Sequence, residues 1–158
     1  MKKGSTLFLK SVILLIAFGS LASLIYLPLT EGRATNLNLI NIYTDPFILY
    51  TYVATIPFFI ALFQAIKLLG YIDENNIFSS SAVKTLRDIK YCALACICFL
   101  IVAILYIQLI AQGDDPAGPT MLGIIAIFAS TVIATSCGVF QKLLQNAVDI
   151  KSENDLTV

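Results

Sequence analysis

The chain has 158 residues, of which 58% are hydrophobic and 13% charged, and its formal net charge is zero. Soluble domains seldom combine so many apolar residues with so few charges, so the composition indicates an integral membrane protein. The balanced charge argues against direct nucleic-acid binding. The sequence contains no histidine, which removes the commonest general base and the commonest metal ligand.

Four uncharged stretches are long enough to cross a bilayer, residues 11–30, 46–66, 91–113 and 116–141. A helix needs about 20 apolar residues to span the hydrocarbon core. None of the stretches alternates as a barrel strand does, and a helix satisfies its own backbone hydrogen bonds in lipid. The sequence therefore predicts an all-α polytopic membrane protein, a single domain over residues 1–158 with four transmembrane helices in a bundle. The first stretch is too long for a typical signal peptide, so we expect an uncleaved anchor.

The basic residues are distributed unevenly among the segments that join these stretches. Nine of the ten precede the first stretch, lie between the second and third, or follow the fourth, and only Arg33 falls in the segment 31–45. The positive-inside rule then places both termini, the loop 67–90 and the tail 142–158 in the cytoplasm. The segment 31–45 and a tight turn around Asp114 are expected outside, and the protein is expected in the cytoplasmic membrane.

The second and fourth stretches begin and end alike. Each begins with Asp-Pro, at Asp45-Pro46 and Asp115-Pro116, and each ends with Phe-Gln, at Phe63-Gln64 and Phe140-Gln141. Asp followed by Pro is a common helix start in unrelated proteins, so coincidence also explains the likeness. The alternative is a duplication, in which the chain consists of two helical hairpins related as parallel repeats.

Small residues recur at every fourth position of the last stretch, at Ala126, Ser130, Ala134 and Gly138. Such spacing lets a neighbouring backbone approach closely, and we interpret the four residues as a helix-packing seam within the chain. The alternative is a homo-oligomer joined through the same face. Glutamines in the stretches are expected to hydrogen-bond between helices or to lie at the membrane interface, at Gln64, Gln108 and Gln141.

Residues that could carry a reaction or bind a metal are scarce. A thiolate metal site of Cys92, Cys96 and Cys137 is geometrically conceivable, but no second Cys-x-x-Cys pair or histidine supports it. We therefore expect these thiols and Cys98 to be small buried side chains, without a metal or cofactor. The sequence has no recognisable nucleophile–base pair or phosphate loop, so we expect no enzyme. No charged residue lies deep in a stretch, so transport by this chain alone is not expected.

The segment 67–90 carries the largest number of charges between two stretches. Ser79 is a good helix cap, with Phe78 and Val83 placed to form a hydrophobic staple. An apolar stripe follows at helical spacing, formed by Ala82, Val83, Leu86, Ile89 and Ala93. This pattern fits a short helix that leads directly into the third span, lying along lipid headgroups or serving as a docking surface. The candidate docking residues are the charged ones off the stripe and in the tail: Lys84, Arg87, Asp88, Glu153 and Asp155.

Two phrases of the sequence, Ile77–Ala93 and Ala147–Val158, together with the four-span layout, resemble one bacterial family. It is catalogued as Domain of Unknown Function 2975 and comprises small YoaS-like membrane proteins. The resemblance covers nearly the whole chain and implies a membrane protein without an established activity. Members are often encoded beside a small Cro/CI-type helix-turn-helix regulator, so the resemblance implies such a regulator as a candidate cytoplasmic partner.

Two classes of function remain open at this point. The first is a non-enzymatic regulatory or sensory membrane component that engages a cytoplasmic partner through the loop 67–90 and the C-terminal tail. The alternative is a small-molecule or lipid-binding or transport protein that acts as an oligomer. For the alternative we expect a cavity near Pro57, which lies midway along the second stretch and should kink its helix.

Overall fold

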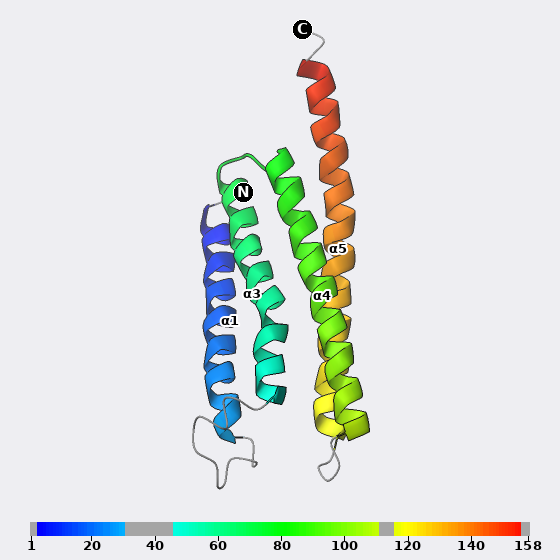
Figure 1. Ribbon diagram of the computed structural model, residues 1–158. Coiled ribbons are helices and arrows are strands. Elements are labelled where there is room, and N and C mark those ends of the chain that lie inside the picture. Colours follow the sequence, from blue (N-terminus) through cyan, green and yellow to red (C-terminus); the bar gives the residue numbers. More distant parts are fainter. Residues whose placement is uncertain (1–2, 31–45, 111–115, 156–158) are drawn as a thin grey trace.

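The computed structural model describes residues 3–30, 46–110 and 116–155. They form four helices, α1 (Lys3–Thr30), α3 (Pro46–Asp73), α4 (Ser80–Ile110) and α5 (Ala117–Asp155) (Figure 1). Each helix is long and apolar enough to cross a membrane. The prediction of an all-α protein with four membrane-spanning helices is therefore confirmed. The expected external loop 31–45, which contains Arg33, and the turn around Asp114 lie outside the described residues.

The helices extend well beyond the uncharged stretches at one end of the molecule. Of the segment 67–90, only residues 74–79 lie outside a helix, because α3 continues to Asp73 and α4 begins at Ser80. The predicted helix that leads into the third span is thus the first part of α4. The tail is helical as far as Asp155, and the end of α5 projects past the other helices (Figure 1).

Backbone capping fixes the turn between α3 and α4. Asn75 adopts a left-handed conformation with a φ of 54°, which asparagine tolerates better than most residues. The Asn75 and Asn76 amides donate to the carbonyls of Ile72 and Tyr71 at 3.2 and 2.8 Å, the pattern of a Schellman motif. Four residues later Ser79 caps α4, since its Oγ accepts a hydrogen bond from the Ala82 amide at 3.3 Å. The cap was predicted correctly, and the turn holds α3 and α4 as an antiparallel pair.

The two residues of the predicted hydrophobic staple differ in burial. Val83 is buried, but Phe78 is 54% exposed. A staple requires both side chains to cover each other, so Phe78 gives little of the expected contact. Val83 instead belongs to the packed interior.

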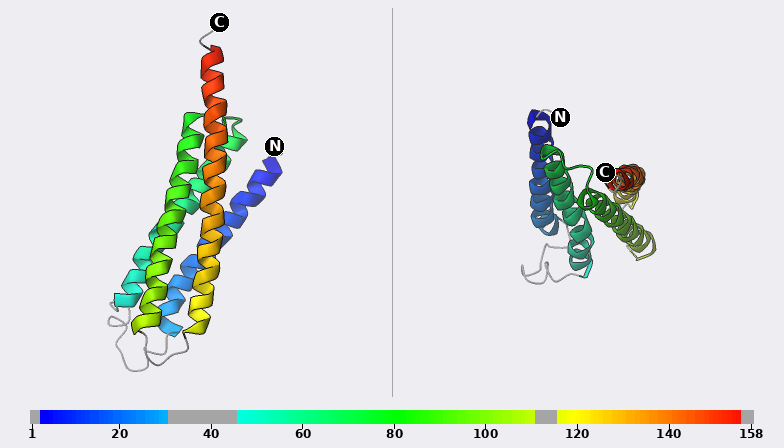
Figure 2. Two further views of the ribbon diagram at one scale, coloured as in Figure 1. Left: turned by 90° about the vertical axis from the view of Figure 1, so that its right-hand side faces the viewer. Right: turned by 90° about the horizontal axis from the view of Figure 1, so that it is seen from above.

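The helices pack in chain order as an open row. Among the described residues, the substantial interfaces are α1 with α3, α3 with α4, and α4 with α5. The view along the helices shows α1 and α5 at opposite ends of this row (Figure 2). Each helix therefore keeps a wide uncovered surface, and large apolar side chains are exposed along all four. Such a surface is typical of contact with lipid tails rather than water.

The buried core is concentrated near the turn between α3 and α4. The predicted stripe of α4 is buried in full, at Ala82, Val83, Leu86, Ile89 and Ala93. Leu69 of α3 and Thr85 are buried at the same end. The stripe thus packs within the protein, which decides against the interpretation that it lies on lipid headgroups.

Candidate functional site

Two charged residues of α4 point away from the buried stripe. Lys84 and Arg87 are exposed, whereas the apolar positions between and beside them are covered. This arrangement leaves both cations free to meet another molecule at the membrane surface. Asp88, the third candidate on α4, is only half exposed and has a partner inside the protein.

Asp88 connects α4 to α3. Its Oδ2 accepts a hydrogen bond from Gln64 Nε2 at 3.0 Å, and the other amide atom, Gln64 Oε1, is buried without a partner in the described part of the chain. The amide is therefore held by Asp88 alone, and an unpaired buried amide is costly. Gln108 similarly joins α4 to α5, because its Nε2 donates to Thr120 Oγ1 at 2.9 Å. The prediction that glutamines bridge helices is confirmed for these two.

The tail acids lie at a different level of the molecule from the cations of α4. Gly138 of α5 lies beside Lys90 of α4, so the two antiparallel helices can be aligned at this point. Counting outward at about 1.5 Å per residue puts Glu153 roughly 13 Å beyond Lys84 along the axis. Glu153 is exposed, and Asp155 follows it at the end of the helix. The predicted docking residues thus form two separate patches.

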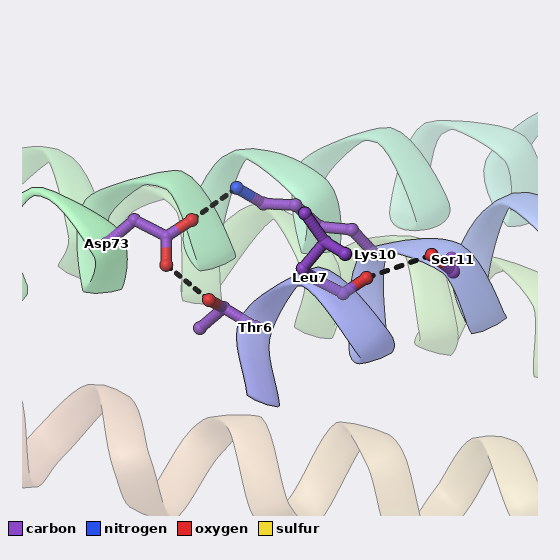
Figure 3. A network of polar contacts seen from close by, with 5 residues as sticks. All are labelled: Thr6, Leu7, Lys10, Ser11 and Asp73. Carbon is purple, nitrogen blue, oxygen red and sulfur yellow. Dashed lines mark hydrogen bonds and ion pairs between the residues drawn. The ribbon is translucent and has the colours of Figure 1, made fainter. Parts of the chain in front are cut away.

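A polar network that the sequence did not predict fastens α1 to the end of α3. Lys10 Nζ lies 2.5 Å from Asp73 Oδ2, and the Thr6 hydroxyl donates to the other carboxylate oxygen (Figure 3). Thr6 is only 1% exposed, while the side chains of Lys10 and Asp73 are about one-third exposed. Charge-assisted hydrogen bonds of this kind are stronger than neutral ones. The network therefore fixes α1 at the end where α3 turns into α4.

The available sequence signal for this network was the spacing of Thr6 and Lys10. Residues four apart lie on one helix face, so both could reach one partner. The partner was not foreseen, because Asp73 was assigned to a loop rather than to the last turn of α3.

The small-residue seam of α5 faces α4. Ala134 is 6% exposed, Ala126 and Ser130 are half-buried, and a Cβ added to Gly138 would lie 3.7 Å from Lys90 Cδ. Gly123 extends the same face by nearly one turn, since a Cβ there would come within 2.8 Å of Ile104 Cδ1. The sequence contained a signal for this extension, because Gly123 precedes Ala126 by three residues and so continues the small-residue pattern on the same face.

An open groove of about 410 Å³ lies along the contact between α4 and α5. Two lysines line it, Lys90 and Lys142, and Ala134 and Gly138 lie between the helices. Its remaining lining residues are Leu94, Ile97, Thr131, Thr135 and Val139. The groove is therefore apolar over most of its length and basic at the end nearest the α3–α4 turn.

A second open groove, of about 490 Å³, lies between α1 and α3. Thr55 and Phe58, on either side of Pro57, contribute to it, as do Gly19 and Ser23 of α1. The expected cavity near Pro57 thus has a counterpart in the structure. It is lined by small, hydroxyl-bearing and apolar residues, without a charged one.

The cysteines do not assemble into a site in the described part of the chain. Cys92, Cys96 and Cys137 are half-buried, Cys98 is exposed, and all four are free thiols. No group of three or more cysteine, aspartate or glutamate side chains there could hold a metal ion. The arrangement provides no ligand set for the thiolate site considered from the sequence.

Comparison with known proteins agrees with this description of a helical membrane protein. Residues 28–158 match the family described as "Protein of unknown function (DUF2975)". The chain is 46% identical over 161 residues to the uncharacterized membrane protein YoaS of Bacillus subtilis (strain 168), and the alignment covers the whole of both chains. No solved structure matches. The chain therefore belongs to the DUF2975 family of proteins of unknown function, as a multi-pass membrane protein.

Proposed function

We propose that this protein is a non-enzymatic regulatory or sensory component of the cytoplasmic membrane that holds a cytoplasmic partner protein. The observation that carries the proposal is the end of α5, which projects past the other helices (Figure 1). Ile150 on this projection is 67% exposed, and Leu143, on the part of α5 that still lies beside α4, is 59% exposed. A helix with uncovered apolar residues outside the membrane spans is a common means of recognising another protein.

The charges near the projection support the same proposal. Lys84 and Arg87 are exposed at the start of α4, and Glu153 is exposed near the end of α5. A partner that contacts both patches would meet basic charge near the membrane and acidic charge farther from it. Such an arrangement favours one orientation of the partner, because charge complementarity sets register more than affinity. A small helix-turn-helix regulator remains the candidate partner that the family resemblance implies.

The test is affinity purification of the full chain from native membranes, followed by mass spectrometry. The variant Lys84→Glu with Arg87→Glu reverses the basic patch, and we expect it to lose a partner that the wild-type chain retains. Lys67→Glu is the matched control, because Lys67 is an exposed cation on α3. Recovery of every wild-type partner by the double variant would reject the docking role of this patch.

The cytoplasmic location of both patches requires a separate test. In a chain without its native cysteines, single cysteines at positions 80 and 35 replace Ser80 and Thr35. We expect an impermeant thiol reagent added to intact cells to label position 35 and to leave position 80 unlabelled. The reverse pattern would place the docking surface outside the cell and exclude a cytoplasmic partner.

A second candidate function, small-molecule or lipid handling by an oligomer, is favoured by the groove beside Pro57. The replacement Gly19→Leu would fill this groove, and no atom lies within 4 Å of a Cβ added there. Handling of a ligand in the groove would then be lost without loss of the fold. Unchanged export or retention of small molecules and lipids by cells that carry the variant would exclude this candidate.

A further inference from the structure

We propose that the groove between α4 and α5 binds one anionic phospholipid, with its phosphate between Lys90 and Lys142 and an acyl chain along the apolar part. The proposal concerns a site on the side of the molecule that faces lipid and is independent of partner docking. It rests on the charge, the length and the chemical character of the groove.

The basic end of the groove offers two cations without a protein anion. The ion pair of Lys10 with Asp73 involves neither lysine, and no carboxylate in the described part of the chain lies within ion-pair distance of Lys90 or Lys142. Lys90 is half-buried, and its Nζ lies 5.5 Å from the centroid of the Tyr91 ring. The nearby carboxylates have other partners, since Asp88 accepts from Gln64 and Asp149 accepts from Gln145. A phosphate would therefore meet two cations that have no carboxylate in direct ion-pair contact.

The two lysines also lie at the depth where headgroups are found. Lys90 precedes the third uncharged stretch directly, and Lys142 follows the fourth. From Lys142 the groove continues along α5 to Thr131, a rise of about 16 Å. That distance is close to half of the roughly 30 Å hydrocarbon core, which is the depth of one leaflet. The groove thus matches a single lipid in length.

The inner part of the groove suits an acyl chain better than a polar ligand. Its two hydroxyl groups donate to their own helix, Thr131 to the Ile127 carbonyl and Thr135 to the Thr131 carbonyl, each at 2.8 Å. No hydroxyl hydrogen is then left for a ligand. The sides of the groove are formed by Leu94, Ile97 and Val139. Gly138 leaves the space between the helices open because it has no side chain. A free inorganic phosphate would fill only the basic end.

The experiment uses the full chain purified in a non-ionic detergent and native mass spectrometry with added lipids. Phosphatidylglycerol is compared with phosphatidylcholine of the same chains, and we expect a preference for phosphatidylglycerol. The variant Lys90→Gln with Lys142→Gln should weaken phosphatidylglycerol binding roughly 25-fold, since each lysine near anionic lipid contributes a factor of about five. The control Lys67→Gln with Lys151→Gln removes two exposed lysines outside the groove and should keep the preference.

Two further measurements test the apolar part of the groove and distinguish the lipid from free phosphate. Val139→Trp fills the groove at an exposed position and should reduce phosphatidylglycerol binding while the lysines stay in place. Inorganic phosphate in hundredfold excess should leave the bound lipid in place. The proposal is overturned if the two double lysine variants bind phosphatidylglycerol equally well. It is also overturned if Val139→Trp binds the lipid as the wild type does, or if inorganic phosphate displaces the bound lipid. Thermal unfolding of each variant in the same detergent verifies that it is folded.

Discussion

The start of α4 and the end of α5 are two amphipathic segments that differ in whether their apolar side chains are covered. Both lie at the same end of the molecule, and each combines charged residues with apolar ones at helical spacing (Figure 1). The stripe of α4 is covered by the protein, so that Leu86 is only 5% exposed, whereas Ile150 of α5 is 67% exposed. The difference shows that an amphipathic pattern does not determine whether the rest of the chain covers its apolar residues.

A second pair of residues shows the same difference in polar chemistry. Asp88 and Asp149 each accept a hydrogen bond from a glutamine Nε2, at 3.0 and 2.8 Å. The donor to Asp88 is Gln64 on another helix, while the donor to Asp149 is Gln145 one turn away on the same helix. The first bond therefore holds two helices together, and the second supports only one.

The largest expected effect is on the covered stripe. Leu86→Ala should lower the free energy of unfolding by about 2 kcal/mol or more, because it leaves a cavity among packed side chains. Thermal unfolding in detergent is the measurement. Leu143→Ala, at an exposed position of α5, is the matched control. It should change the free energy of unfolding by less than about 0.5 kcal/mol. Equal losses in the two variants would mean that the end of α5 is covered in the membrane-bound protein.

A somewhat smaller effect is expected where α5 is itself covered. Ala134→Leu introduces a larger side chain at a position that is 6% exposed against α4, and such overpacking costs about 1–3 kcal/mol. A substitution to leucine at an exposed position, Ile125→Leu, is the control, and it leaves the side-chain volume unchanged. Similar melting temperatures for the two variants would show that α4 and α5 separate at this seam.

The aspartate pair gives the next effect in size. Asp88→Ala should cost about 1–2 kcal/mol, since it leaves the buried amide of Gln64 without its partner. Asp149→Ala removes an exposed contact within one helix, and we expect a change of less than about 0.5 kcal/mol. Chemical denaturation followed by circular dichroism measures both. A stable Asp88→Ala variant would contradict the role assigned to this hydrogen bond.

The smallest effect on stability is expected at the tip of α5, where the effect on binding should be large. Ile150→Ser removes an exposed apolar side chain, so unfolding should remain within about 0.5 kcal/mol of the wild type. Co-purification of the cytoplasmic partner should decrease strongly, because the exposed apolar residues are the proposed contact. Lys151→Ser, an exposed neighbour, serves as the control. Full partner recovery with Ile150→Ser would exclude the projecting helix as the docking element.

Much of the fold was predictable because lipid imposes simple rules on a chain. Uncharged stretches of sufficient length predicted four helices, and the cap at Ser79 set the start of α4. At the basic end, α3 and α5 continue as helices beyond the predicted spans and into charged sequence. A charged residue ends a hydrophobic stretch but does not end a helix, so hydropathy locates the membrane boundary rather than the helix end.

The candidate sites were less predictable, because they depend on contacts between distant residues. Lys84 and Arg87 were identified as surface charges from their positions off the stripe, and both are exposed. The partnership of Asp88 with Gln64 and the network of Thr6, Lys10 and Asp73 were not foreseen. The groove with Lys90 and Lys142 was not foreseen either, since it requires the register of α4 against α5.

The sequence alone determined that this protein is a helical membrane protein with four spans, because each span must satisfy its own backbone and face lipid. It also determined where the helix cap and the small-residue pattern lie, since both are local. Only the tertiary structure decided that the stripe of α4 is core, that the end of α5 is uncovered, and that the helices form an open row. The physical reason is that burial depends on which helices lie side by side and in what register, and the apolar pattern of one helix specifies neither.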